Sequence, residues 1–159
     1  MSVAIYPGSF DPITNGHVSI IESGLVCFER LIVAVLRNPK KSSLFTVEER
    51  VEMIRDHFAN TPNIEVDSFD GLLVDYCRKK KSRVVLRGLR AVADFEYELQ
   101  MANMNRHLNE EVVTVFIMAN DAYFYVASGL CKEVTKLGGD VSKLVPRPVA
   151  PKLRAKLGL

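Results

Sequence analysis

Cysteine, net charge and long apolar runs are all scarce in this chain of 159 residues. Its three cysteines lie far apart and form no CxxC pair, so neither a disulfide framework nor a zinc site is predicted. Unpaired thiols suit a reducing compartment, and we expect a cytoplasmic protein. The net charge of +2 is too small to indicate a nucleic-acid partner.

The sequence also lacks an apolar run near the roughly 20 residues that a membrane-spanning helix needs. Its first residues lack the charged and hydrophobic regions of a signal peptide, so we expect neither a membrane partner nor a signal peptide. Internal repeats and low-complexity stretches are absent. Apolar residues make up 48% and charged residues 25%, as in an ordinary globular protein, and the length predicts one domain over residues 1–159.

The stretch between residues 3 and 17 predicts a strand, a loop and the start of a helix. Residues 3–6 are continuously apolar, as in a strand that is covered on both faces, and Pro7 and Gly8 are expected to end it. Apolar positions 18, 21, 25 and 28 then recur at helical spacing. A loop from the carboxyl end of a strand to the amino end of a helix is a common phosphate site, since free backbone N–H groups and the positive end of the helix dipole meet there.

The rest of the chain alternates strands and helices. Strands are predicted at residues 31–36, 64–69, 83–86 and 112–118, and Arg87 and Gly88 are expected to end the fourth of these five strands. Helices are predicted after a capping box at Thr46, over residues 72–80 and 93–108, within residues 123–136, and at most briefly in the proline-containing tail. This alternation predicts an α/β fold: a Rossmann-like, five-stranded parallel sheet with helices on both faces.

Polar and basic residues follow several of the predicted strands, and a parallel sheet brings the carboxyl ends of its strands to one edge. That edge would gather Ser9 and His17, Lys40 and Lys41, residues 70–73, Arg87 and Arg90, and the residues from Asn120 onward. Their convergence suits a polyanionic substrate, such as a nucleoside triphosphate together with a second phosphate compound. The other basic run, residues 78–81, is expected to be a solvated helix end.

Residues 87–98, with the sequence RGLRAVADFEYE, form a second informative stretch. Local rules describe it as a strand end, a glycine turn and the acidic first turn of a helix. In that interpretation Asp94 and Glu96 complement the helix dipole, and the arginines are solvated surface. On spacing alone, this structural interpretation and a phosphate-binding one are both open.

These motifs carry a resemblance to a known family. Thr14-x-Gly16-His17 matches the T/HxGH signature of the nucleotidyltransferase superfamily, and the longer run YPGSFDPITNGH closely resembles the opening of the bacterial phosphopantetheine adenylyltransferases. RGLRxxxDFEYE is a second signature of that family, and FTxEER, residues 45–50, lies between the two. The resemblance covers essentially the whole chain. It implies reversible transfer of an adenylyl group from ATP to 4′-phosphopantetheine, which gives dephospho-coenzyme A and pyrophosphate in coenzyme A biosynthesis.

The resemblance also implies roles for individual residues. The catalytic residues would be His17, which stabilises the transition state, with Lys41 and Arg90. ATP would contact Ser9, Phe10, His17, Gly88, Leu89, Arg90, Glu98, Tyr123, Phe124, Tyr125, Val126, Ala127, Ser128 and Gly129. The phosphopantetheine would contact Ser9, Lys41, Leu73 and Arg87, and Asp94 would support the basic cluster. Mg²⁺ would be bound mainly through ATP, and no metal ligand is predicted in the protein.

The expected chemistry is an in-line attack of the acceptor phosphate on the α-phosphorus of ATP, which needs alignment and countercharge rather than a protein nucleophile. The chain departs from the family in one turn. The family usually has a serine-rich run where this chain has Val126-Ala127-Ser128-Gly129. Two hydroxyls are lost, each with a hydrogen bond of about 0.5–1.5 kcal/mol, so we expect a weakened or repositioned triphosphate contact.

Two alternatives stay open. The T/HxGH motif alone also fits another small-molecule nucleotidyltransferase, acting on nicotinate mononucleotide or glycerol phosphate, although residues 87–98 and the compact length argue against it. The altered turn is the only support for a nucleotide-binding module with impaired catalysis. The resemblance further implies a homohexamer, with coenzyme A as a feedback inhibitor.

Overall fold

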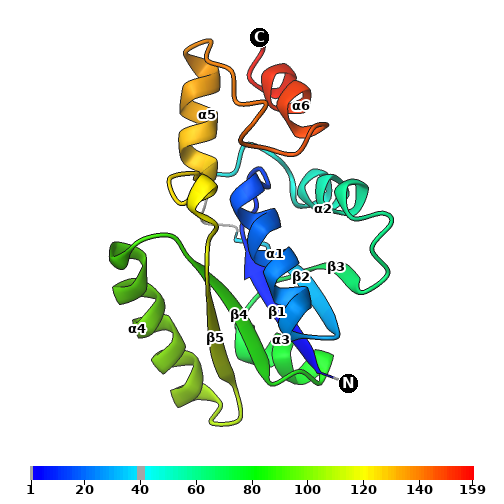
Figure 1. The fold of residues 1–159 in the computed structure, drawn as a ribbon. Helices are drawn as coiled ribbons and strands as arrows, with labels where there is room; N and C mark the ends of the chain where they lie inside the picture. Colours follow the sequence, from blue (N-terminus) through cyan, green and yellow to red (C-terminus); the bar gives the residue numbers. More distant parts are fainter. Residues whose placement is uncertain (1, 39–41) are drawn as a thin grey trace.

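The computed structural model describes residues 2–38 and 42–159, and these build an α/β fold around a five-stranded sheet (Figure 1). The strand order is β3-β2-β1-β4-β5, and every neighbouring pair is parallel. The strands span Val3–Gly8 (β1), Arg30–Leu36 (β2), Ile64–Phe69 (β3), Val84–Leu89 (β4) and Val113–Met118 (β5). The predicted fold class is confirmed.

Helices follow the strands and cover both faces of the sheet. They span Asn15–Cys27 (α1), Val47–His57 (α2), Leu73–Lys80 (α3), Val92–Leu108 (α4), Ser128–Lys136 (α5) and Val149–Lys156 (α6), with a short 3-10 turn, η1, over Asp121–Tyr123. One buried cluster joins Ala4 and Tyr6 of β1 to α1, α2 and α6, and a second joins Ile5 to α3. Because successive residues of β1 face opposite clusters, the whole strand is apolar.

Helices α1 and α2 begin at threonine caps. Thr46 accepts the N–H of Glu49, whose carboxylate accepts the N–H of Thr46, which confirms the predicted capping box. At α1, Thr14 accepts the N–H of His17, and the His17 ring replaces the usual glutamate as the reciprocal acceptor. The cap therefore orients a predicted site residue.

Two predicted strand ends are wrong, because β1 and β4 continue through residues that usually break strands. Pro7 and Gly8 lie within β1 and pair with Ala34 and Val35 of β2. The ladder between β1 and β4 ends at Ile5, so the missing N–H of Pro7 costs no hydrogen bond on that side.

In β4, Arg87 and Gly88 continue the ladder to β5, where their partners are Phe116 and Ile117. A Cβ at Gly88 would lie 2.7 Å from a side-chain carbon of Ile20 in α1. Gly88 therefore permits close helix–sheet packing rather than a turn, and Arg87 is fixed on a hydrogen-bonded strand.

Other features agree with expectation in part. The basic run at the end of α3 is mixed: Arg78 is exposed and pairs with Asp75, whereas the ammonium of Lys80 is partly buried between Glu65 and Asp67. The three cysteines are free thiols. Within the described residues, every helix is too short or too polar to cross a membrane.

Candidate functional site

The divergence of β1 and β4 opens a crevice at their carboxyl ends. Strand β1 pairs with β2 over its full length but with β4 only as far as Ile5, so the chain departs in opposite directions from two adjacent strands. Such a switch point is where parallel α/β sheets bind ligands. A cavity of about 300 Å³ lies there, lined by the β1–α1 loop, the end of β4, the start of α4 and the residues before α5.

His17 forms one wall of this cavity. We call it the nucleotide-side cavity, after the ligand that the sequence leads us to expect there. Its Nδ1 accepts the backbone N–H of Thr14 at 3.0 Å and lies 3.1 Å from the hydroxyl of that residue. Phe10 packs edge-on against the imidazole, with 5.0 Å between ring centroids. Burial, then Arg90 and Arg87, lower the pKa of His17 to about 4, so the ring is neutral at pH 7. Since Nδ1 is an acceptor, Nε2 carries the proton and is available as a donor.

Two arginines from β4 and its end supply positive charge. Arg87 donates through Nε to Glu98 at 2.7 Å and through Nη1 to the carbonyl of Pro7 at 2.6 Å. Burial opposes the charge on Arg87, but the Glu98 carboxylate outweighs it and raises the pKa of the guanidinium. The contact with the Pro7 carbonyl ties the cation to β1 across the gap between the strands.

Arg90 lies just past the end of β4, on the side of α5. Its Nε donates to Asp94 at 3.0 Å, and Nη1 reaches the carbonyl of Val126 at 3.4 Å. Burial alone would raise the pKa of Asp94, but the Arg90 hydrogen bonds outweigh it and lower that pKa. In this geometry Asp94 holds Arg90 beside the cavity, while its support of the basic cluster toward a ligand stays a prediction.

A second cavity of about 390 Å³ adjoins the first and is mainly apolar, and we call it the arm cavity. Leu73 lies in its wall, as does Phe69, which stacks on Tyr76 with 4.6 Å between ring centroids. Ser9 and Arg87 line both cavities, so the polar groups at the shared boundary face a polar site on one side and an apolar slot on the other. An apolar ligand group with an anionic end at Arg87 suits this second space.

The turn before α5 closes the nucleotide-side cavity. Ala127 is the N-cap of α5, and no side-chain cap is present at this helix end within the described structure. The hydroxyl of Ser128 donates to the carbonyl of Pro12 at 2.7 Å, so it is engaged by the β1–α1 loop. What the turn offers a phosphate is therefore the backbone N–H groups at the start of α5.

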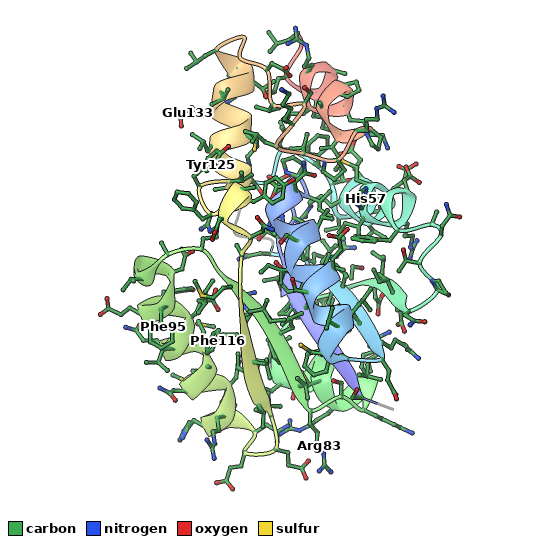
Figure 2. All side chains as sticks on the ribbon, viewed as in Figure 1. His57, Arg83, Phe95, Phe116, Tyr125 and Glu133 are labelled. Carbon is green, nitrogen blue, oxygen red and sulfur yellow. The ribbon has the colours of Figure 1, made fainter. Side chains whose placement is uncertain are left out.

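The predicted residues divide into three groups. The nucleotide-side cavity brings together Ser9, Phe10, His17, Arg87, Gly88, Arg90, Glu98, Val126, Ala127 and Ser128, and Leu73 lines the arm cavity. Among the described residues, five predicted for ATP line neither cavity: Leu89, Tyr123, Phe124, Tyr125 and Gly129. Tyr125 is half exposed at the base of α5 (Figure 2). Lys41 lies outside the described residues, and its role stays a prediction.

Sequence reasoning assigned no role to several residues that line the cavities. Tyr6 and Thr14 face the nucleotide side, and burial raises the pKa of Tyr6 to about 12, so its phenol stays protonated. Tyr97, Met101, Met104 and Leu108 of α4 line the arm cavity. Thr14 stands inside the T/HxGH motif, and the α4 residues recur at helical spacing, so both signals were present in the sequence.

The described residues contain no group of three or more His, Cys, Asp or Glu side chains that could hold a metal ion. The carboxylates nearest the nucleotide-side cavity are already paired: Asp94 with Arg90, and Glu98 with Arg87. A divalent cation here would depend on ligands brought by the substrate.

The fold and the crevice are those of a nucleotide-binding α/β protein, and comparison with known proteins assigns this chain to the nucleotidyltransferases. The family model described as cytidylyltransferase-like matches residues 5–134. The crystal structure of a Vibrio parahaemolyticus protein whose assignment as a nicotinate-nucleotide adenylyltransferase is provisional superposes with a TM-score of 0.71 over 96% of this chain and 99% of the other. At 16% sequence identity, this likeness concerns the fold alone.

Sequence relatives narrow the class. The chain is 57% identical to the phosphopantetheine adenylyltransferase of Anaeromyxobacter sp. (strain K), over 98% of this chain and 94% of the relative. It is 54% identical to the phosphopantetheine adenylyltransferase of Alkaliphilus metalliredigens (strain QYMF), over 98% of this chain and 99% of the relative. The chain therefore belongs to the phosphopantetheine adenylyltransferase family.

Proposed function

We propose that the chain transfers the adenylyl group of ATP reversibly to 4′-phosphopantetheine, forming dephospho-coenzyme A and pyrophosphate. One observation carries the assignment of the site: a polar cavity and an apolar cavity meet at Ser9 and Arg87, where β1 and β4 part. ATP occupies the polar cavity, and the pantetheine arm occupies the apolar one beside Leu73. The two phosphates then meet at the shared boundary.

In the proposed reaction, a phosphate oxygen of the acceptor forms a bond to the α-phosphorus of ATP, and the bond from that phosphorus to the oxygen bridging to the β-phosphate breaks. Pyrophosphate leaves with the electron pair. His17 donates its Nε2–H to a non-bridging α-oxygen, and its neutral state at pH 7 removes any need for prior protonation. Arg90 binds the triphosphate and Arg87 the acceptor phosphate, and Lys41 retains its predicted role there.

The remaining residue assignments belong to the same proposal. Glu98 orients Arg87 through their two-point ion pair and lies within reach of ATP. Backbone N–H groups at the start of α5 bind phosphate oxygens. Residues predicted for ATP that lie outside the cavity wall, such as Leu89, Tyr125 and Gly129, would act through the backbone or on the adenosine. Mg²⁺ would be held mainly through ATP and, when bound, would supply positive charge that offsets the phosphates.

The test is pyrophosphate release from ATP and Mg²⁺, with and without 4′-phosphopantetheine, and with nicotinate mononucleotide as the control acceptor. Release that depends on phosphopantetheine is expected. Release that depends on the control acceptor instead would replace the proposal by another nucleotidyltransferase activity. ATP binding with no release for either acceptor would support a nucleotide-binding module with impaired catalysis.

The proposal includes a homohexamer, in which the exposed apolar side of α4 and the edge strand β5 are covered by other copies. Val92 is 89% exposed. Phe95 and Leu99 follow it at helical spacing, and each of these residues is about two-fifths exposed. Phe95 also packs edge-on against Phe116 of β5, so helix and strand present one surface (Figure 2). An open strand edge beside exposed apolar residues favours association. Light scattering on the protein as it elutes from a size-exclusion column measures the number of copies in the assembly.

The wider assignments follow from the activity. Residues 1–159 act as one domain, and the reaction takes place in the cytoplasm, where the free thiols remain reduced. Coenzyme A is proposed as a feedback inhibitor, as the resemblance implies, and its pantetheine arm would occupy the arm cavity proposed for the substrate. Its inhibition should be competitive with phosphopantetheine in the assay above.

A further inference from the structure

A buried carboxylate behind the nucleotide-side cavity joins three segments that are far apart in the sequence. Asp11 has a side chain only 8% exposed, and it lies in the β1–α1 loop. Its Oδ1 accepts the N–H of Phe45 at 2.9 Å, and its Oδ2 accepts the N–H of Leu44 at 3.0 Å. The ammonium of Lys132 in α5 lies 2.8 Å from the same Oδ2.

Two of the three segments that meet at Asp11, the β1–α1 loop and the start of α5, also line the nucleotide-side cavity. Its neighbour Phe10 packs edge-on against His17. The carbonyl of its other neighbour, Pro12, accepts a hydrogen bond from the hydroxyl of Ser128. Ser128 lies one helical turn before Lys132. Helix α5 is therefore tied to the β1–α1 loop at two successive turns, and the upper tie is the ion pair with Asp11.

Arg50 of α2 makes a second brace from the opposite side. Its guanidinium donates to the carbonyl of Ser9 at 2.7 Å and to that of Thr46 at 3.2 Å, and the residue is 4% exposed. Arg50 thus holds the loop just before Asp11 and the start of α2 just after Phe45. Arg50 and Asp11 therefore join the β1–α1 loop to the same segment at the start of α2. Arg50 does so through backbone carbonyls, and Asp11 through backbone N–H groups.

The charge on Asp11 is permanent over the physiological range. Burial alone would raise the pKa of its carboxyl, but the hydrogen bonds from Lys132, Phe45 and Leu44 outweigh burial and lower it. A carboxylate with both oxygens occupied is rigidly held, because each donor fixes one direction. The side chain of Asp11 is almost fully buried, its two oxygens are engaged by protein donors, and it is not among the described residues that line either cavity. We therefore expect it to act without touching either substrate.

We propose that Asp11 is a positioning residue for the transfer reaction: through Lys132 it sets α5, and through Leu44 and Phe45 it sets the segment before α2, in register with the loop that leads into α1 and His17. This inference rests on the proposed function. Its consequence is that the phosphate-facing start of α5 depends on an ion pair that no substrate touches.

The test compares Lys132→Met, Lys132→Arg, Asp11→Asn and the double variant Asp11→Asn/Lys132→Met with the wild-type protein. Lys132→Met is expected to raise the dissociation constant of ATP, measured by calorimetry, and to lower kcat, each by about tenfold, the scale of one lost charge-assisted hydrogen bond. Lys132→Arg keeps the charge and should recover most of both. Asp11→Asn should lower kcat further, since an amide places an N–H₂ group against a donor.

Because the two side chains act through one bond, the double variant should lose less than the product of the single losses. The matched control is Lys152→Met, which removes a half-exposed ion pair with Asp56 between α6 and α2. It should leave ATP affinity and kcat within about twofold of wild type, as for most surface pairs. Thermal melting of each variant gives its folded fraction, and kcat is calculated per molecule of folded protein.

Two results would overturn the inference: Lys132→Met with wild-type ATP affinity and kcat, or losses in the double variant that multiply in full. A melting temperature that falls while both constants stay unchanged would assign Asp11 a structural role alone. If Asp11→Asn does not fold, the Lys132 variants decide the question. A wild-type protein that binds ATP without phosphopantetheine-dependent release would refute the proposed function, whereas the ATP affinities would still test the positioning role.

Discussion

The change Ala127→Ser tests how the turn before α5 holds the triphosphate. Ala127 is the N-cap of α5, has extended backbone angles and lines the nucleotide-side cavity, but it brings no side-chain acceptor to the helix end described here. A serine at this position can accept an N–H from the first turn of α5, while its O–H points to the cavity. Capping should raise the free energy of unfolding by about 1 kcal/mol, and the melting temperature by roughly 2–4 °C for a chain of this length.

The same hydroxyl should also strengthen ATP binding. One neutral hydrogen bond contributes about 0.5–1.5 kcal/mol, which lowers the dissociation constant of ATP by about two- to tenfold. Calorimetric titration with ATP and Mg²⁺ measures this change. Gly129→Ser is expected to give less, because a Cβ at Gly129 meets nothing within 4 Å and the residue lies outside the described cavity wall.

Ala91→Ser is the matched control, since Ala91 is the N-cap of α4, is exposed and likewise makes no side-chain cap within the described structure. It should stabilise the protein to a similar extent and leave ATP affinity unchanged. If Ala127→Ser and Ala91→Ser raise stability equally and neither changes ATP affinity, the hydroxyl only caps the helix. The reasoning that links the lost serine hydroxyls to weaker triphosphate binding would then be wrong.

Three further predictions follow from the site and its packing. His17→Ala should lower kcat by at least about a hundredfold, the cost of one donor to developing charge, and a near-normal rate would remove His17 from the mechanism. The pKa of His17 is about 4 in the folded state, against 6.5 for an unperturbed histidine, so the unfolded chain binds the proton first as the pH falls. The contribution of His17 to the free energy of unfolding therefore decreases as the pH drops from about 6.5 to 4. Urea unfolding across this range should therefore show a steeper loss for wild type than for His17→Asn, and equal slopes would contradict the shift. Gly88→Ala should destabilise the protein by about 1–3 kcal/mol through overpacking against Ile20, measured by the same unfolding curves, while a neutral effect would show that α1 can move aside.

Local signals in the sequence predict the elements and part of the site. The capping box at Thr46 depends on residues three apart, so the sequence pattern is sufficient to predict it. The cap at Thr14 has the same spacing, but His17 stands in place of the usual glutamate, and only the structure shows it. The order of strands and helices follows from apolar periodicity in the same way. The convergence of His17, Arg87 and Arg90 follows from the geometry of parallel sheets, which brings strand ends to one edge.

Long-range contacts explain what the sequence does not predict. Gly88 has the local signature of a turn, but its lack of a side chain is needed for the approach of α1, and only the folded structure brings Ile20 to it. The ties of Asp11 to Phe45 and Lys132 span 34 and 121 positions, so no periodic pattern records them. Buried polar residues with distant partners are for this reason the part of the site that needs coordinates.

The extension of β4 past Leu86 has a consequence for how two phosphate compounds share one crevice. Successive side chains of a strand point to opposite faces: Gly88 meets Ile20 of α1 on one face, and Arg87 meets Glu98 of α4 on the other. Arg87 therefore stands at the wall of the arm cavity, whereas Arg90, beyond the strand, turns toward Val126 near α5. In the proposed reaction, the pleat of the strand and its end would thus place Arg87, at the boundary of the two cavities, near the acceptor phosphate and Arg90 near the triphosphate. A turn at Arg87, as the sequence first suggested, would not impose that division.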